Sequence, residues 1–132
     1  MPAKGPHKNM KNIFILDDDI MRHKALVKKA SELVNFEAAE VHIAFDAKDA
    51  KRILLERTYW DVIMLDHDLG NQVFVDSREE NTGLQVAKFI RENNIKFGRC
   101  LLHSMNPVGV KNMLEELEGL GDVYRSPFFL MI

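Results

Sequence analysis

Short apolar runs alternate with segments of helical periodicity along almost the whole chain. The apolar runs are rich in Val, Ile and Leu, which is typical of strands buried in a sheet. They predict five strands, at residues 12–17, 40–45, 61–66, 98–103 and 122–124. In the segments between them, apolar residues recur at the period of an amphipathic helix. These segments predict helices at residues 20–34, 47–57 and 83–93, and a fourth that starts at Pro107 and ends at the glycines 119 and 121.

Strands that alternate with helices imply a parallel sheet with helices on both faces, because right-handed crossovers allow little else. We therefore predict a single-domain α/β fold, a doubly wound five-stranded parallel sheet with the strand order 2-1-3-4-5. In this order the third strand lies between the first and the fourth. Residues 12–132 form the predicted domain, and residues 1–11 are expected to be a flexible, basic N-terminal tail.

The composition is typical of a soluble domain with one core. The chain has 132 residues, of which 46% are hydrophobic and 29% charged, and its net charge of −2 favours neither nucleic acid nor acidic partners. The single cysteine, Cys100, lies in a predicted strand and cannot form an internal disulfide, which fits a reducing compartment. No apolar run approaches the roughly 20 residues that span a bilayer, and no signal segment is visible. We expect a cytoplasmic protein with no membrane contact.

Ionisable side chains follow the first and the third predicted strands. They form two runs, Asp17-Asp18-Asp19 and Asp66-His67-Asp68. Neighbouring strands lie about 4.8 Å apart, and the carboxyl ends of parallel strands are where ligands bind. Five carboxylates are therefore expected at one edge of the sheet. Like charges this close are unfavourable unless a cation or a raised pKa relieves them, so the pattern predicts a bound divalent metal.

Carboxylate oxygens suit a hard cation, so we expect Mg²⁺ or Mn²⁺ as the cofactor. The preferred ligand set is Asp18, Asp19 and Asp66, with Asp17 and Asp68 as reserves. A second interpretation stays open for the first run, because Asp is also a favoured residue for capping the helix that follows.

The order of these residues resembles the receiver domain of two-component response regulators. In that family an acidic pair follows the first strand, a phospho-accepting aspartate ends the third, a hydroxyl ends the fourth, and a lysine precedes a proline after the fifth. Here Asp66 stands at the phospho-acceptor position, and Ser104 is the hydroxyl equivalent, with His103 as the alternative register. The resemblance covers nearly the whole chain and implies a receiver-like, flavodoxin-like fold.

Two departures separate the chain from ordinary receivers. Ser126, before Pro127, stands where receivers carry the lysine, and Arg125 is one position away. The segments 65–70 (LDHDLG) and 102–109 (LHSMNPVG) resemble a divergent clade, the cyclic-phosphate-processing receiver domain. This second resemblance implies hydrolysis of cyclic phosphates on RNA ends or nucleotides.

The polar residues at the strand ends suggest roles in such a reaction. The catalytic candidates are His67 and His103, one as base and the other as acid, in either assignment, together with Asp66. The candidates for holding the phosphate are Ser104, Asn106, Arg125 and the N-terminal amides of the helix that starts at Pro107. Each has a plainer alternative: His67 could only orient an aspartate, His103 could be a hydrogen-bonded strand-end residue, and Ser104 and Asn106 could only cap the helix.

Three functions stay open at this point. The leading one is a metal-dependent phosphoesterase that acts on a phosphate-containing small molecule or an RNA end. The second is a phospho-accepting receiver, which Ser126 at the lysine position disfavours. The third is a pseudo-receiver that pairs through its last helix and last strand, for which a homodimer is one form of partnership. Residues 70–81 exceed the usual connection of roughly 2–6 residues, so they are a candidate lid or recognition loop.

Overall fold

The computed structural model describes residues 10–126. Within them, parallel strands form one five-stranded sheet in the order β2-β1-β3-β4-β5. The strands are β1 (Lys11–Leu16), β2 (Ala39–Ala44), β3 (Tyr59–Leu65), β4 (Lys96–Leu102) and β5 (Asp122–Arg125). The helices are α1 (Ile20–Leu33), α2 (Ala47–Leu54), α3 (Gly83–Glu92) and α4 (Pro107–Leu117). The predicted α/β class, the parallel sheet and its strand order are confirmed.

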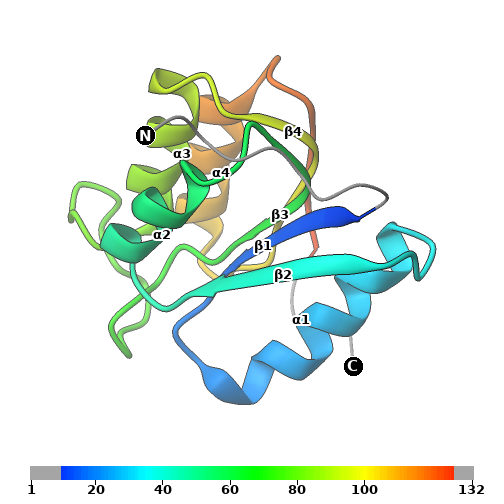
Figure 1. The fold of residues 1–132 in the computed structure, drawn as a ribbon. Helices are drawn as coiled ribbons and strands as arrows, with labels where there is room; N and C mark the ends of the chain where they lie inside the picture. Colours follow the sequence, from blue (N-terminus) through cyan, green and yellow to red (C-terminus); the bar gives the residue numbers. More distant parts are fainter. Residues whose placement is uncertain (1–9, 127–132) are drawn as a thin grey trace.

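Helices cover both faces of the sheet, with α1 on one face and α2, α3 and α4 on the other (Figure 1). Successive side chains of a strand point to opposite faces. In β1, Ile13 and Ile15 pack in the cluster that includes α1, whereas Phe14 and Leu16 pack in the cluster that includes the other three helices. Because the central strands are buried on both faces, they are nearly continuous apolar runs in the sequence.

The elements differ from their predicted bounds by a few residues. β3 begins at Tyr59 rather than at residue 61, because Tyr59 and Trp60 already pair with β4. α2 ends at Leu54 rather than at residue 57. Beyond that helix the Arg57 guanidinium forms an ion pair of 2.7 Å with Glu40, at the start of β2.

Both ends of the chain lie partly outside the described residues. Of the predicted tail, residues 1–9 are outside, while Lys11 already belongs to β1. Pro127 and the residues after it are also outside. Among residues 10–126, no helix combines the length and apolar character that a membrane crossing needs. Cys100 is a fully buried free thiol of β4 whose pKa is raised by burial, as expected for a small hydrophobe in the core.

Each helix begins at a side chain that caps it. The capping residues are Asp19, Asp46, Thr82 and Asn106, which accept hydrogen bonds from the amides of Met21, Asp49, Gln85 and Gly109 respectively. Capping satisfies amides that have no partner inside the helix. The caps at Asn106 and at an aspartate of the first acidic run agree with the capping alternatives raised from the sequence. The strand ends that precede the helices therefore lie at one edge of the sheet, and the polar residues of the motifs lie there too.

Candidate active site

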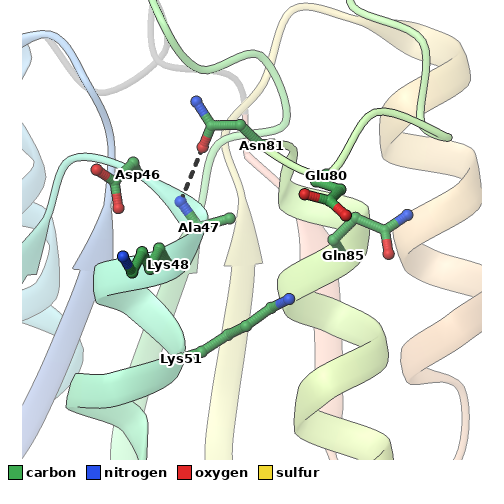
Figure 2. A pocket seen from close by; sticks show the side chains of 7 residues that line it. All are labelled: Asp46, Ala47, Lys48, Lys51, Glu80, Asn81 and Gln85. Atoms are coloured by element: carbon green, nitrogen blue, oxygen red, sulfur yellow. Dashed lines mark hydrogen bonds between the residues drawn. The ribbon is translucent and has the colours of Figure 1, made fainter.

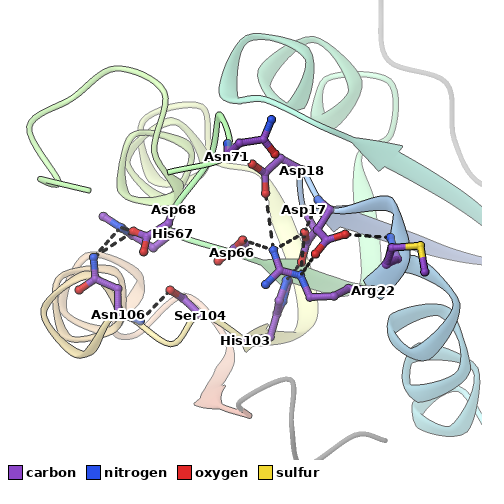
Figure 3. A network of polar contacts seen from close by, with 12 residues as sticks. Asp17, Asp18, Arg22, Asp66, His67, Asp68, Asn71, His103, Ser104 and Asn106 are labelled. Carbon is purple, nitrogen blue, oxygen red and sulfur yellow. Dashed lines mark hydrogen bonds and ion pairs between the residues drawn. The ribbon is translucent and has the colours of Figure 1, made fainter. Parts of the chain in front are cut away.

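Three buried ionisable residues meet where β1, β3 and β4 end. They are Asp17, Asp66 and His103, each directly after its strand. Backbone hydrogen bonds of 3.0 Å, from Asp66 N to Leu16 O and from His103 N to Leu65 O, hold these positions in register. One potential ligand atom of each of the three side chains lies within 4.8 Å of the others. We call this group the Asp17–Asp66–His103 cluster; Figure 3 shows it with its surroundings.

His103 and Asp17 form a buried pair. His103 Nε2 lies 2.9 Å from Asp17 Oδ2, and neither side chain is exposed to solvent. Burial opposes ionisation of Asp17, but the hydrogen bond from His103 and the positive charge nearby outweigh it and lower the Asp17 pKa. Since an ionised Asp17 accepts from Nε2–H, the other ring nitrogen, Nδ1, can carry the lone pair; it has no hydrogen-bond partner among residues 10–126.

Asp66 is the carboxylate that ionises least readily. It is 3% exposed, and burial raises its pKa to about 6, with the charges of Asp17 and Asp18 adding to the effect and those of His103 and Arg22 opposing it. The cluster therefore lacks enough positive charge to keep both buried carboxylates fully ionised.

Arg22, on the first turn of α1, supplies the positive charge that the cluster does have. Its Nη2 lies 2.8 Å from Asp17 Oδ1, 3.2 Å from Asp66 Oδ2 and 3.5 Å from Asp18 Oδ1 (Figure 3). Our sequence analysis missed this residue. The available signal was its spacing, because Asp18 and Arg22 are four apart on the start of a helix and such residues are neighbours.

Asp18 and Asp19, the other two aspartates of the first run, have different contacts. Asp19 caps α1, with its Oδ1 accepting from Met21 N at 2.9 Å, and its side chain is about half exposed. Asp18 Oδ2 accepts from Asn71 N at 2.6 Å, which ties the 70–81 loop to the edge of the sheet. Of the predicted ligand set, the structure thus brings Asp66 and Asp17 together, keeps Asp18 beside Arg22, and turns Asp19 to the helix.

His67 belongs to a second, separate network. Its Nδ1 lies 2.9 Å from Asp68 Oδ1, and its Nε2 lies 2.8 Å from Ser77 Oγ in the 70–81 loop. The ring is fully buried and packs against Gly109, where a Cβ atom would lie 2.4 Å from the imidazole. Only glycine therefore fits at that position of α4. His67 has no open face toward solvent, and any action on a substrate would pass through Ser77.

Asn106 and Asp68 complete this second network. Asn106 Nδ2 donates to Asp68 Oδ1 at 3.0 Å and to Val75 O at 3.2 Å. Asp68 also accepts from the amides of Phe74 at 2.6 Å and Val75 at 3.1 Å. Burial opposes its ionisation, but the hydrogen bonds from Asn106, His67 and the loop amides together lower the Asp68 pKa. Asp68 therefore anchors the loop, and the structure keeps it out of the Asp17–Asp66–His103 cluster.

The remaining candidates lie at the ends of β4 and β5. Ser104 is buried, and its Oγ accepts from Asn106 N at 3.1 Å. Arg125 ends β5 opposite Leu102 and is exposed. Within residues 10–126, no hydrogen bond or ion pair joins Arg125 to the cluster. Ser126 follows it, with its amide bonded to Leu102 O at 2.9 Å.

The 70–81 loop is fixed at its far end as well. Asn81 Oδ1 accepts from Ala47 N, the first amide of α2, at 2.9 Å (Figure 2). A pocket of about 630 Å³ lies there between α2 and α3, with Lys48, Lys51 and Glu80 among its lining residues. Hydrogen bonds from the loop to Asp18, Asp68 and α2 thus hold it against the same edge of the sheet as the cluster.

The sheet order and the carboxylates after β1 and β3 define a receiver-type domain, and comparison with solved structures agrees. The chain is 18% identical to the Mn²⁺-bound form of response regulator Rcp1, with a TM-score of 0.56 over 92% of this chain and 86% of that chain. It is 16% identical to a CheY-like receiver domain from Methanospirillum hungatei JF-1, with a TM-score of 0.54 over 91% and 86% of the two chains. The chain is 17% identical to the structure described as the CheX–CheY–BeF₃–Mg²⁺ complex from Borrelia burgdorferi. The TM-score is 0.54, over 90% of this chain and 81% of that chain.

The family assignment is more specific. The family model of the cyclic-phosphate processing receiver domain matches residues 11–119, and the chain belongs to that family. No protein among the curated sequences matches the chain. The match confirms the resemblance carried by the segments 65–70 and 102–109.

The raised pKa of Asp66 predicts a pH-dependent stability. The carboxyl is protonated more readily in the folded than in the unfolded state, so the folded protein loses stability as the pH rises from about 4 through about 6. We expect Asp66→Asn to remove this loss. In urea titrations the gain in free energy of unfolding over wild type should be larger at pH 8 than at pH 4, by about 3 kcal/mol. Asp122→Asn, an exposed change on β5, is the control; equal gains at both pH values would contradict the burial argument.

The position of Arg22 predicts a strong energetic coupling to Asp66. Removing one partner of a buried pair leaves an uncompensated charge, so Arg22→Met should lower the free energy of unfolding by about 3 kcal/mol in the wild-type background. In the Asp66→Asn background the loss should be smaller by about 1 kcal/mol or more, measured in a double-mutant cycle at pH 8. Additive losses would show that Arg22 does not compensate Asp66.

Proposed function

We propose that this protein is a metal-dependent phosphoesterase that opens a cyclic phosphate on an RNA end or a nucleotide in the cytoplasm. One observation carries the proposal: three neighbouring strands bring two buried carboxylates and a buried imidazole within 4.8 Å of one another. Helix caps account for Asp19 and Asn106 but not for this meeting of Asp17, Asp66 and His103. Burial of like charges at strand ends is a feature of functional sites rather than of cores.

The residues fit a hard cation. Potential ligand atoms of Asp17 and Asp66 lie within 4.8 Å of each other, and two Mg²⁺–oxygen bonds of about 2.1 Å each span roughly 4.2 Å. One ion would therefore reach both carboxylates after a small shift of these side chains and of Arg22, whose Nη2 contacts both. The raised pKa of Asp66 indicates a local shortage of positive charge, which a divalent ion would relieve. When bound there by Asp17 and Asp66, with Asp18 beside them, Mg²⁺ or Mn²⁺ would polarise the phosphoryl oxygen and offset the charge that builds on it.

The chain's own residues account for the proton transfers. Asp66, the carboxylate with the raised pKa, would accept the proton of the attacking water, while the buried His103 would hold Asp17 through its Nε2 proton. The new P–O bond forms as the bond to the ribose oxygen breaks. That oxygen takes a proton from Ser77 Oγ, which regains one from His67 Nε2, while Asp68 holds the opposite side of the imidazolium. Arg22 would contact the phosphate beside Asp66, in the part that a lysine plays in receivers.

A second function is favoured by the position of Asp66 at the end of β3. Solved structures similar to this chain include receiver domains and a response regulator bound to beryllium trifluoride. Asp66 could therefore accept a phosphoryl group in place of hydrolysing a cyclic ester. Two features weigh against it: Ser126 stands at the lysine position, and His103 forms a buried pair with Asp17 for which phospho-acceptance gives no reason.

The proposal predicts hydrolysis that depends on the metal, on Asp66 and on His103. With Mg²⁺ or Mn²⁺ and a panel of 2′,3′-cyclic and 3′,5′-cyclic nucleotides, Asp66→Asn and His103→Gln should each lower kcat by about 100-fold or more. Ser77→Ala should lower kcat by about tenfold or more on the same substrates. His42→Gln, a change of a partly buried histidine on β2, should leave turnover within twofold of wild type.

Two results would contradict the proposal. The first is full activity of His103→Gln and Asp66→Asn. The second is absence of hydrolysis together with stable phosphorylation of Asp66 by acetyl phosphate, detected by intact mass and lost in Asp66→Asn, which would establish the second function.

A further inference from the structure

A second pocket lies beside the His67–Asp68 network. It has a volume of about 660 Å³ and lies between the 70–81 loop and the first turn of α4. Its lining includes Phe74, Ser77, Lys88, Asn106, Val108 and Asn112. Ser77 and Asn106 hydrogen-bond to His67 and Asp68 respectively. Two lining residues of the pocket therefore contact the 65–70 segment.

Phe74 is presented to this pocket at an energetic disadvantage. It is 71% exposed, and its φ of 53° lies in the left-handed region that a bulky residue seldom adopts. Its amide donates to Asp68 Oδ2 at 2.6 Å, so the active-site network itself holds this conformation. Val108, 66% exposed, lines the same pocket. An aromatic ring held in solvent beside a site is a binding feature that folding does not require.

Phe36 shows that the conformation alone is not the signal. It is 73% exposed with a φ of 57°, but its amide bonds Ser31 O at 2.8 Å and so ends α1. This arrangement is an ordinary helix terminus. Phe74 follows no helix, and it faces a pocket.

The pocket combines an aromatic ring with polar and cationic groups. Asn112 donates to Ser77 Oγ at 2.9 Å, which leaves its carbonyl oxygen as an acceptor. Lys88 adds positive charge to the wall, whereas Arg78 is paired at 2.7 Å with Asp76, which also lines the pocket. Bases stack on aromatic side chains and hydrogen-bond through their edges, and the volume is within the range of small-molecule sites. These chemistries together suit a nucleoside bearing a phosphate.

We propose that this pocket binds the nucleoside part of the substrate, with the base stacked on Phe74 and the ribose toward Ser77. The proposal rests on the proposed function for the position of the phosphate at the Asp17–Asp66–His103 cluster. It specifies where the nucleoside of that substrate, free or at an RNA end, is recognised, and it excludes cyclic phosphates of simple polyols.

The test measures binding separately from hydrolysis. Adenosine 3′-monophosphate and ribose 5-phosphate are titrated calorimetrically into wild type, Phe74→Ala and the matched control Phe36→Ala. We expect wild type to bind the nucleotide at least tenfold more tightly than the sugar phosphate, and Phe74→Ala to lose about tenfold in nucleotide affinity. Phe36→Ala should bind as wild type does. Equal affinity of wild type for the two ligands, or equal affinity of all three proteins for the nucleotide, would overturn the proposal.

Fluorescence gives an independent readout of stacking. Trp60 is the single tryptophan and is fully buried, so Phe74→Trp and Phe36→Trp each add one exposed reporter. Adenosine 3′-monophosphate should quench the reporter at residue 74 saturably and the one at residue 36 only in proportion to concentration. Absence of saturable quenching at both positions would contradict the proposal. A change of oligomeric state in Phe74→Ala, together with no nucleotide binding by wild type, would also contradict it, because the surface would then be a protein interface.

Two further comparisons complete the test. One distinguishes failure of this proposal from failure of the proposed function, and the other distinguishes a free nucleotide from an RNA end as the ligand. Nucleotide binding without hydrolysis would retain the pocket and remove the phosphoesterase. Equal kcat/KM for a nucleoside 2′,3′-cyclic phosphate and for glycerol cyclic phosphate would retain the enzyme and remove the pocket. Tighter binding of a tetranucleotide ending in a 3′-phosphate would support the pocket with an RNA end as its ligand, and equal binding would support it with a free nucleotide.

Discussion

The balance of charge at the ends of β1 and β3 is the constraint on which the rest of this edge depends. Two carboxylates are buried there because parallel pairing places their strands side by side. Arg22 and His103 compensate them in part, and the raised pKa of Asp66 shows that the compensation is incomplete. A fold without a ligand to bind would gain stability by replacing one of these carboxylates. A bound cation, as in the proposed function, would relieve the remaining negative charge.

The same residues organise the loop beside the cluster. Asp18 and Asp68 each flank the cluster in sequence, and each accepts hydrogen bonds from amides of the 70–81 loop. The acidic runs thus have two roles. Asp17 and Asp66 place buried negative charge in the cluster, whereas Asp18 and Asp68 hold the 70–81 loop in a defined conformation. This division explains how Phe74 is kept exposed and why the histidines of the two motifs belong to separate networks.

The sequence predicted the fold well because strand order depends on features that are local or general. Apolar runs, helix periodicity and caps such as Asp46 and Thr82 are visible in the chain, and right-handed crossovers limit the topologies. Convergence of Asp66 with the first acidic run also followed from strand adjacency. The selection of Asp17 over Asp19 did not follow, because it depends on which aspartate continues the strand and which caps α1.

Sequence reasoning missed Arg22 and Ser77 for different reasons. Arg22 reaches Asp66 across 44 positions through a side-chain direction that periodicity does not give. Ser77 contacts His67 because hydrogen bonds from the 70–81 loop to Asp68 and Asn106 position the loop over His67. No periodicity in the sequence indicates this contact. The segments 65–70 and 102–109 identify His67 and His103 together as family residues. That the two histidines belong to separate networks is visible only in the structure.

The most direct test of the shared cation is a Mn²⁺ titration followed by NMR. At pH 8, substoichiometric Mn²⁺ should first broaden the amide signals of residues 17–18, 66–67 and 103–104, and Asp66→Asn should abolish this selectivity. Uniform broadening of exposed acidic positions in both proteins would contradict the view that one ion joins the carboxylates of β1 and β3.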